Sequence, residues 1–217
     1  MTDIIGKLGE LGIIPVVKIE NIDHAPKLAE ALMSAGLPCA EITFRTKYAG
    51  ESIQKIFECQ PEILVGAGTV LFVEQAKQAI SAGAKFIVSP GINMQVIDYC
   101  LEQGVAVIPG IATPSEAMLA MSRGLDVLKF FPAQALGGIN YLQTISPALP
   151  GASYIPTGGV NPENMVDWLK LPIVHAVAGS WIVTSKLLTE GRFEEITHLS
   201  LQAVELVRTA RQITEEK

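Results

Sequence analysis

A lysine inside a strongly apolar run is the residue of this chain best suited to covalent chemistry. Lys129 stands between Leu128 and Phe130, and Pro132 closes the run where a buried strand would leave its sheet. Burial disfavours the charged form of an amine, and a neutral amine can attack a ketone to form a Schiff base. The cationic nitrogen of a Schiff base weakens the neighbouring carbon–carbon bond. The competing interpretation is a lysine that reaches solvent or pairs with a carboxylate.

Three polar residues recur at alternate positions in an earlier stretch, 40–45. If this stretch is a strand, Glu41, Thr43 and Arg45 lie on one side of it, and we expect that side to face the interior of the fold. Taken alone, Glu41 and Arg45 would be more typical of a structural ion pair. Opposite a reactive amine, they become candidates for proton transfer and anion binding.

Two glycine-rich turns indicate a phosphate site. Thr157, Gly158 and Gly159 follow one apolar run, and Ser180 follows Gly179 after the next. Exposed backbone amides after the last two strands of a barrel are a recurrent phosphate cradle. We therefore prefer phosphate binding at these turns.

Other turns carry weaker signals. Gly68 lets the backbone approach a ligand and Thr69 offers a hydroxyl, although an ordinary tight turn would have the same composition. The turns around Pro90 and Gly110 are equally typical of loops without a ligand. Lys18, in the run 13–19, is the one rival amine, and the polar residues that follow it favour an electrostatic or solvated role.

Short apolar runs alternate with segments of helical period, which predicts a parallel sheet covered by helices. The predicted strands are 13–19, 39–43, 63–67, 86–89, 105–109, 127–131, 154–157 and 176–178. The predicted helices are 1–11, 24–35, 49–59, 73–82, 94–103, 114–123, 139–149, 162–169 and 193 to about 214.

Eight strand–helix units favour a (β/α)8 barrel, also called a TIM barrel. Gly83, Gly104 and Gly124 each precede a predicted strand and recur about every 20 residues, as tight strand–helix units would. A doubly wound open sheet is the alternative fold, but it usually has a glycine-rich fingerprint after its first strand, which is absent here. The apolar stripe on the last helix is expected to pack on the barrel wall.

Composition predicts one globular domain spanning residues 1–217. The chain is 49% hydrophobic and 18% charged, with a net charge of −6. That charge argues against nucleic acid or an anionic membrane as a partner. The N-terminal stretch is amphipathic rather than signal-like, and no apolar run is long enough to span a membrane, so we expect a cytoplasmic protein.

Neither the cysteines nor the histidines have the spacing of a metal site. Cys39, Cys59 and Cys100 are odd in number and lack a CxxC motif, as is typical of thiols in a reducing compartment. The three histidines are scattered through the chain. We expect no metal and no other cofactor.

Taken together, six motifs closely resemble the bacterial 2-keto-3-deoxy-6-phosphogluconate (KDPG) aldolases, also called 4-hydroxy-2-oxoglutarate (KHG) aldolases. The likeness runs in the same order from about residue 12 to residue 183. The motifs are Glu41-Ile-Thr-Phe-Arg45, Gly66-Ala-Gly-Thr69, Phe86-Ile-Val-Ser-Pro90-Gly, Val107-Ile-Pro-Gly110-Ile-Ala-Thr-Pro114, Leu128-Lys129-Phe-Phe-Pro132 and Pro156-Thr-Gly-Gly159-Val.

The resemblance implies a cofactor-free class I aldolase that assembles as a homotrimer of (β/α)8 barrels. It would cleave a phosphorylated keto-deoxy sugar acid into pyruvate and glyceraldehyde 3-phosphate, as in the Entner–Doudoroff route. By position, the Schiff-base lysine is Lys129, the proton carrier is Glu41, the pyruvyl carboxylate is held by Arg45 and Thr69 with Pro90 nearby, and the phosphate end is held by Gly158, Gly159 and Ser180 beside Thr157. Lys18 departs from the arginine frequent in the family, and it lacks the bidentate fork of arginine.

The sequence leaves several functions open. A 2-keto-3-deoxy-6-phosphogalactonate aldolase presents the same pyruvyl half, and so does an enzyme specific for 4-hydroxy-2-oxoglutarate. A phosphate-binding epimerase, isomerase or thiamin-phosphate-synthase-like barrel would share the glycine-rich turns without needing a reactive amine. A non-catalytic sugar-acid binding protein would keep the pocket but release no pyruvate.

Overall fold

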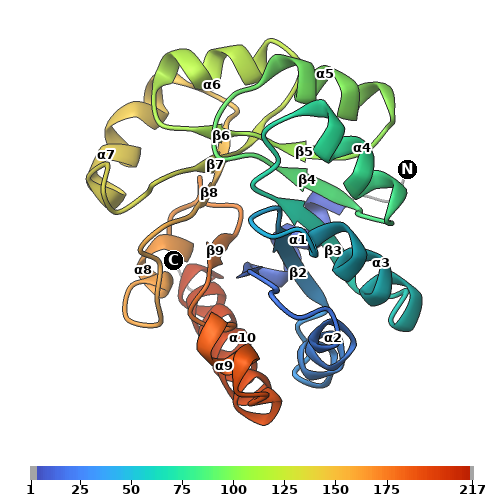
Figure 1. The fold of residues 1–217 in the computed structure, drawn as a ribbon. Coiled ribbons are helices and arrows are strands. Elements are labelled where there is room, and N and C mark those ends of the chain that lie inside the picture. The colour runs from blue at the N-terminus through green and yellow to red at the C-terminus, as the bar shows by residue number, and fades with distance from the viewer. Residues whose placement is uncertain (1–3, 216–217) are drawn as a thin grey trace.

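The structure, a computed structural model, describes the backbone of residues 4–215 and the side chains of residues 4–212. Strands and helices alternate along most of the chain (Figure 1). The strands are β1 (Ile13–Val17), β2 (Cys39–Thr43), β3 (Leu64–Gly68), β4 (Phe86–Val88), β5 (Ala106–Ile108), β6 (Gly110–Ile111), β7 (Val127–Phe130), β8 (Ser153–Pro156) and β9 (Val177–Gly179). The helices are α1 (Ile4–Leu11), α2 (His24–Ser34), α3 (Ala49–Cys59), α4 (Val73–Ser81), α5 (Met94–Glu102), α6 (Pro114–Met121), α7 (Gly138–Ile145), the 3-10 turn η1 (Ser146–Ala148), α8 (Met165–Leu169), α9 (Ser185–Thr189) and α10 (Phe193–Glu215).

The strands are all parallel and form two curled sheets, with helices outside them (Figure 1). One sheet has the order β5-β4-β3-β2-β1-β9, and the other has the order β6-β7-β8. β5 and β6 belong to one stretch of chain, interrupted at Pro109, which has no backbone N–H to donate to a ladder. The predicted α/β fold with a parallel sheet is confirmed.

Every predicted strand and helix overlaps an observed one, and the differences lie at their ends. The predicted strand 13–19 ends earlier, at Val17, so Lys18 follows β1 instead of lying within it. The predicted strand 105–109 corresponds to β5 alone, and the short strand β6 beyond it was not expected. Helix α9 was not predicted. Residues 1–3 of the predicted first helix lie outside the described residues.

The buried apolar side chains form two clusters, one on the outer face of the strands and one on the inner face. Two clusters form because successive side chains of a strand point to opposite faces. The larger cluster lies between strands and helices. The smaller one, here called the interior cluster, collects inward residues from strands of both sheets and is joined by Leu8 of α1. Its members are Leu8, Ile14, Val16, Cys39, Phe86, Val88, Ile108, Val127, Ile155, Ala176 and Ala178.

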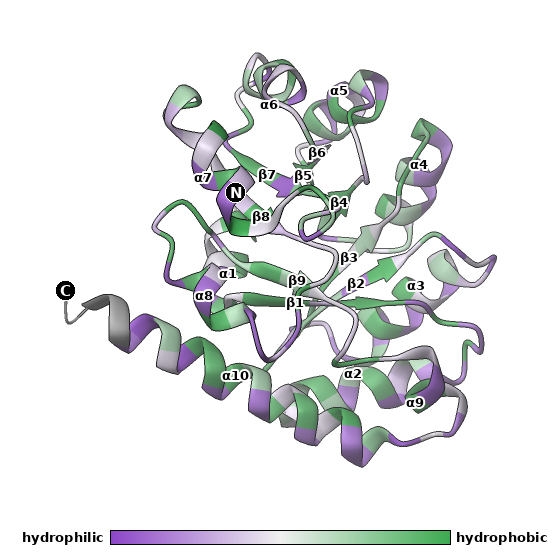
Figure 2. Cartoon of the chain, turned by 90° about the vertical axis from the view of Figure 1, so that its left-hand side faces the viewer, coloured by the Kyte–Doolittle hydropathy of each residue, from purple (hydrophilic) through white to green (hydrophobic). Residues whose placement is uncertain are grey.

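Helix α10 lies along the outside of the sheet, packed against α2 and α8. Its stripe includes Ile196, Ala203, Val207 and Ala210, which are buried, while the outer side of the helix is polar (Figure 2). The expectation that this stripe packs on the strand–helix wall is confirmed. Among the described helices, none combines the length and the apolar character needed to cross a bilayer.

Candidate active site

The buried lysine and a buried carboxylate meet inside the curved sheet. Lys129 comes from β7 and is 6% exposed, and Glu41 comes from β2 and is 1% exposed. The Nζ atom of Lys129 lies 3.3 Å from Oε1 of Glu41. Burying either charged group alone would cost free energy, so the contact between them explains how both can be almost completely buried.

Strand alternation explains why both groups point inward. In β7, Val127 belongs to the interior cluster and Lys129 is the next residue on that face. In β2, Cys39 belongs to the same cluster and is followed by Glu41 and Thr43. The charged pair therefore lies above the apolar interior, toward the carboxyl ends of the strands, where reacting groups gather in folds of this kind.

The nearest thiol does not compete as a nucleophile. Burial raises the pKa of the Cys39 thiol far above its usual range, and the negative charge of Glu41 raises it further. The thiolate is the reactive form of cysteine. Since Cys39 stays protonated near neutral pH, Lys129 is the nucleophile that this interior offers.

Glycines in β3 supply the space for the charged pair. The register sets Gly66 beside Glu41 and Gly68 beside Thr43. A Cβ at position 66 would overlap the ring of Phe86, and a Cβ at position 68 would overlap the Glu41 carboxylate. Gly68 therefore lets the carboxylate lie where it reaches Lys129, a reason for glycine that differs from the approach of the backbone to a ligand that was predicted from the sequence.

Gly68→Ala is expected to reduce kcat by about tenfold to a hundredfold. The added methyl group must displace the Glu41 carboxylate, and a displacement of roughly 1 Å near reacting groups can cost 10²-fold in rate. Gly66→Ala is the matched control, because it overpacks the same face of the same strand against Phe86 instead. Steady-state kinetics and thermal unfolding of both variants test this. If the two variants lose kcat in proportion to stability alone, Gly68 has no special role.

Arg45 and Thr69 lie together at the mouth of the interior. Nε of Arg45 donates a hydrogen bond to Oγ1 of Thr69 at 3.3 Å. Thr69 has a φ of 56°, a left-handed conformation that is rare for a β-branched residue and costs on the order of 1–3 kcal/mol. Arg45, expected on the inward side, is exposed, because β2 ends at Thr43 and its alternation ends there. The guanidinium is thus accessible to a ligand.

Pro90 follows β4 at the same end of the sheet. Its carbonyl group is packed so closely against Gly110 that a Cβ there would overlap it. The neighbouring Ser89 donates a hydrogen bond to the carbonyl oxygen of Gly91 at 2.7 Å. Pro90 therefore belongs to a tight turn above the interior.

A cavity of about 220 Å³ opens beside the carboxyl ends of β1, β2 and β9. Its lining includes Lys18, Arg45, Ser180 and Ser185. Two cations and the serine hydroxyl groups, together with Thr43 and Thr184, line the same space, in a chain whose net charge is −6. This combination suits an anionic ligand.

The turn after β8 presents a free backbone donor. Gly158 and Gly159 have φ values of 94° and 83°, which strongly favour glycine. Within residues 4–212, no acceptor is found for the amide of Gly159, whereas the amide of Gly158 lies on the bridge to Ala178. Thr157 is buried, and its backbone is bridged to Ala178 beside β9, which brings this turn to the end of β9 that carries Ser180.

Sequence reasoning missed the contribution of the segment before α9. Ser185 lines the cavity together with Thr184, whose side chain accepts a hydrogen bond from the amide of Leu187 and so begins α9. A threonine before a short apolar segment is a helix-start signal that could have revealed this element.

No metal cluster accompanies these groups: within the described part of the chain, no three histidine, cysteine or carboxylate side chains are arranged to hold a metal ion. The histidines have separate contacts. His24 is near Asn21, His175 bonds the carbonyl oxygen of Ile5, and His198 is near Gln202.

Comparisons with known proteins show which family this chain resembles. The family described as "Aldolase: KDPG and KHG aldolase" matches residues 4–199. The chain is 42% identical over 207 residues to the 2-dehydro-3-deoxy-phosphogluconate aldolase of Treponema pallidum, covering 95% of this chain and 99% of that one. It is 40% identical over 193 residues to the KHG/KDPG aldolase of Escherichia coli K12, covering 89% and 91%.

A solved structure shares the fold and contains a bound keto acid. It is the KDPG aldolase of Legionella pneumophila with pyruvate captured as a covalent carbinolamine intermediate. The TM-score is 0.88 and the identity is 36%, over 92% of this chain and 97% of that one.

Proposed function

This chain belongs to the KDPG and KHG aldolase family, and from that membership we propose that it cleaves KDPG into pyruvate and glyceraldehyde 3-phosphate through a Schiff base on Lys129. The chain is an aldolase, a carbon–carbon lyase. We extend the proposal to cleavage of 4-hydroxy-2-oxoglutarate into pyruvate and glyoxylate, which share the pyruvyl half. The observation that carries the proposal is the dry contact of Lys129 with Glu41, at 3.3 Å.

The proposed reaction begins with the amine of Lys129. Its nitrogen adds to the C2 carbonyl of the substrate, and loss of water gives the iminium form of the Schiff base. Glu41 then accepts the proton of the C4 hydroxyl, directly or through a water. The C3–C4 electron pair moves toward the iminium, so the bond breaks, the aldehyde leaves and an enamine remains. Protonation of the enamine at C3, followed by hydrolysis, returns the water, releases pyruvate and frees Lys129.

The residues at the mouth hold the two ends of the substrate in this proposal. Arg45 and Thr69 bind the pyruvyl carboxylate, with Pro90 beside it. Support comes from the Arg45–Thr69 hydrogen bond and from the strained backbone of Thr69, which holds its hydroxyl at that position.

The phosphate end is assigned to the turns after β8 and β9. The free amide of Gly159, in the turn that contains Thr157 and Gly158, and the hydroxyl of Ser180 in the cavity provide donors for phosphate oxygens. Lys18 lines the same cavity and adds a second cation besides Arg45.

We further propose that the two sheets are parts of one closed (β/α)8 barrel in a single domain spanning residues 1–217. Two observations support closure: β5 and β6 are one stretch divided at Pro109, and a parallel bridge joins Thr157 to Ala178 next to β9. A homotrimer in the cytoplasm, serving the Entner–Doudoroff route, is the corresponding proposal for assembly and location. Exposed Phe72 and Met118, 60% and 63% accessible, are candidates for burial at a subunit contact.

Borohydride trapping tests the proposal. Incubation with pyruvate and borohydride should reduce the Schiff base to a stable secondary amine, and peptide mass mapping should locate the added group on Lys129. Omission of pyruvate is the control. No labelled lysine, or a label on Lys18, would contradict the assignment, and an epimerase-like or non-catalytic protein would give no label. Pyruvate release from KDPG, its galactonate epimer and 4-hydroxy-2-oxoglutarate then ranks the aldehyde halves.

A further inference from the structure

An ion pair stands at the rim of the proposed phosphate cavity and has no part in the reaction described above. Nζ of Lys18 lies 2.6 Å from Oε1 of Glu20. The two side chains are 40% and 54% exposed, so solvent can reach both. Both residues come after β1, which ends at Val17, so the pair lies past the carboxyl end of that strand. Lys18 there lines the cavity at the mouth.

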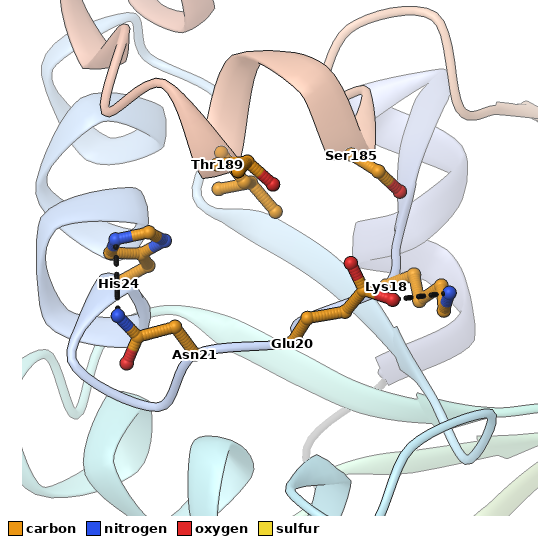
Figure 3. Close-up of a pocket in the computed structure, with 7 residues that line it drawn as sticks. Lys18, Glu20, Asn21, His24, Ser185 and Thr189 are labelled. Atoms are coloured by element: carbon orange, nitrogen blue, oxygen red, sulfur yellow. Dashed lines mark hydrogen bonds and ion pairs between the residues drawn. The ribbon is translucent and has the colours of Figure 1, made fainter.

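Lys18 separates two cavities. The first is the cavity of about 220 Å³ that contains Arg45 and Ser180. The second has about 310 Å³, and Figure 3 shows the Glu20 side chain in it, extended toward Lys18. The polar residues that line the second cavity are Lys18, Glu20, Asn21, His24, Ser185 and Thr189. Lys18 lines both cavities, whereas Glu20 lines only the second, so the carboxylate draws the ammonium group from the second side.

We propose that Glu20 sets the preference of the active site for the charge of the aldehyde half, by engaging Lys18 and making it less available to a phosphate. This inference rests on the function proposed above. The first cavity contains two cations, Lys18 and Arg45, and the ion pair with Glu20 partly neutralises the charge of Lys18. A phosphate monoester, with a charge of about −1.5 to −2 at pH 7, must compete with this carboxylate for the ammonium. The aldehyde half of 4-hydroxy-2-oxoglutarate carries a single carboxylate charge in place of the phosphate, so it gains less from Lys18, and Glu20 therefore lowers the selectivity for phosphorylated substrates.

The size of the effect follows from the exposure of the pair. Exposed ion pairs contribute about 0.2–1 kcal/mol, and salt weakens them. In the upper part of this range, about 0.4–1 kcal/mol, release of Lys18 from Glu20 is worth roughly a twofold to fivefold gain in phosphate affinity at low ionic strength. Because Glu20 acts through Lys18, the gain should vanish when Lys18 is absent. A merely structural role of Glu20 would depend neither on the charge of the ligand nor on salt.

Glu20→Gln tests the inference through binding. Calorimetric titration with glycerol 3-phosphate should give a Kd two to five times lower than that of the wild type at low salt, with a smaller difference at about 0.5 M salt. In steady-state kinetics, KM for KDPG should fall while kcat changes little. KM for 4-hydroxy-2-oxoglutarate, which ends in a C5 carboxylate of single charge and has no phosphate, should change less than twofold.

Three further variants are controls. Glu20→Asp keeps the charge and should resemble the wild type. Glu102→Gln removes one negative charge at the carboxyl end of α5, where the chain returns to the amino ends of the strands, and should leave the Kd unchanged. In a Lys18→Met background, Glu20→Gln should change the Kd less than about 1.5-fold.

Several results would overturn the inference: an unchanged Kd in Glu20→Gln, an equal gain in the Lys18→Met background, or no binding of glycerol 3-phosphate by any variant. None of these measurements requires turnover. Absence of pyruvate release from both substrates by the wild type would instead contradict the proposed function, so the two failures are distinguishable.

Discussion

Lys129→Met is expected to lower kcat/KM for KDPG by about 10⁴-fold or more and to abolish trapping of pyruvate by borohydride. Methionine has a similar volume and no nucleophilic nitrogen, so it cannot form the Schiff base that accepts the electrons of the breaking bond. Steady-state pyruvate release and mass mapping measure the two effects. Lys186→Met is the matched control, since the Lys186 side chain is 75% exposed and its replacement should alter neither result.

A double variant separates the chemistry from the fold. Lys129→Met leaves Glu41 as an unpaired carboxylate that is 1% exposed, and breaking a buried pair in this way costs roughly 3–5 kcal/mol. Adding Glu41→Gln removes the unpaired charge, so the double variant should regain most of the lost stability and none of the activity. Denaturant unfolding measures this recovery. Appreciable cleavage by either variant would show that Lys129 is not the Schiff-base lysine.

The strands were predictable because each is a short, nearly continuous apolar run bounded by polar or glycine-containing turns. β2 has the predicted bounds, and β7 differs from its prediction by one residue at the end. The interruption at Pro109 follows from the missing amide of proline, although the run 105–109 alone did not reveal that a short strand continues beyond it. Helix α9 was missed because its five residues are too few to show a helical period.

The residues that form the site could be predicted from their chemical types, but the contact between them could not. Alternation in β2 and the apolar setting of Lys129 placed each group on an inward face. The contact between Lys129 and Glu41 depends on which strands face each other across the sheet, a property of closure and register that periodicity does not contain. The resemblance to a known family supplied that pairing instead.

The backbone conformation of Thr69 and the ion pair of Lys18 with Glu20 could not be predicted from the sequence. The left-handed Thr69 is exceptional, because composition would place glycine at such a position. The sequence predicted that Gly68 lets the backbone approach a ligand, whereas the structure shows that it leaves room for the Glu41 carboxylate. Lys18 was recognised as a rival amine, whereas its partner Glu20 became evident only from the geometry after β1.

The reacting groups of the site are buried, whereas the charged groups at its entrance are exposed to solvent. Lys129 and Glu41 lie in the interior, where electrostatic interactions are strong because water is excluded. Arg45, Lys18 and Glu20 are accessible to solvent, so their contribution to binding depends on salt. Substitutions in the interior should therefore act on kcat, and substitutions of the charged groups at the rim should act on KM.

Glu41→Gln is expected to lower kcat by about 10²- to 10⁴-fold while Lys129 remains able to trap pyruvate. Glutamine keeps the shape of the side chain but cannot accept the C4 hydroxyl proton or return one to the enamine, and general acid–base catalysis typically contributes a factor of this size. Since Lys129 retains its nitrogen, borohydride should still label it, more slowly if Glu41 also assists imine formation. The loss thus belongs to proton transfer, which separates this variant from Lys129→Met, where both turnover and labelling disappear.

Glu41→Asp provides the graded control for that assignment. Aspartate keeps the carboxylate but is one methylene shorter, so it cannot keep the 3.3 Å contact with Lys129 without movement of the strands. Its kcat should lie between those of the wild type and Glu41→Gln, because the proton acceptor is present but misplaced. A Glu41→Gln variant with wild-type kcat would assign proton transfer to water or to another residue. Equal loss in Glu41→Asp and Glu41→Gln, with stability unchanged, would contradict this graded prediction and would mean that the position of the carboxylate matters as much as its charge.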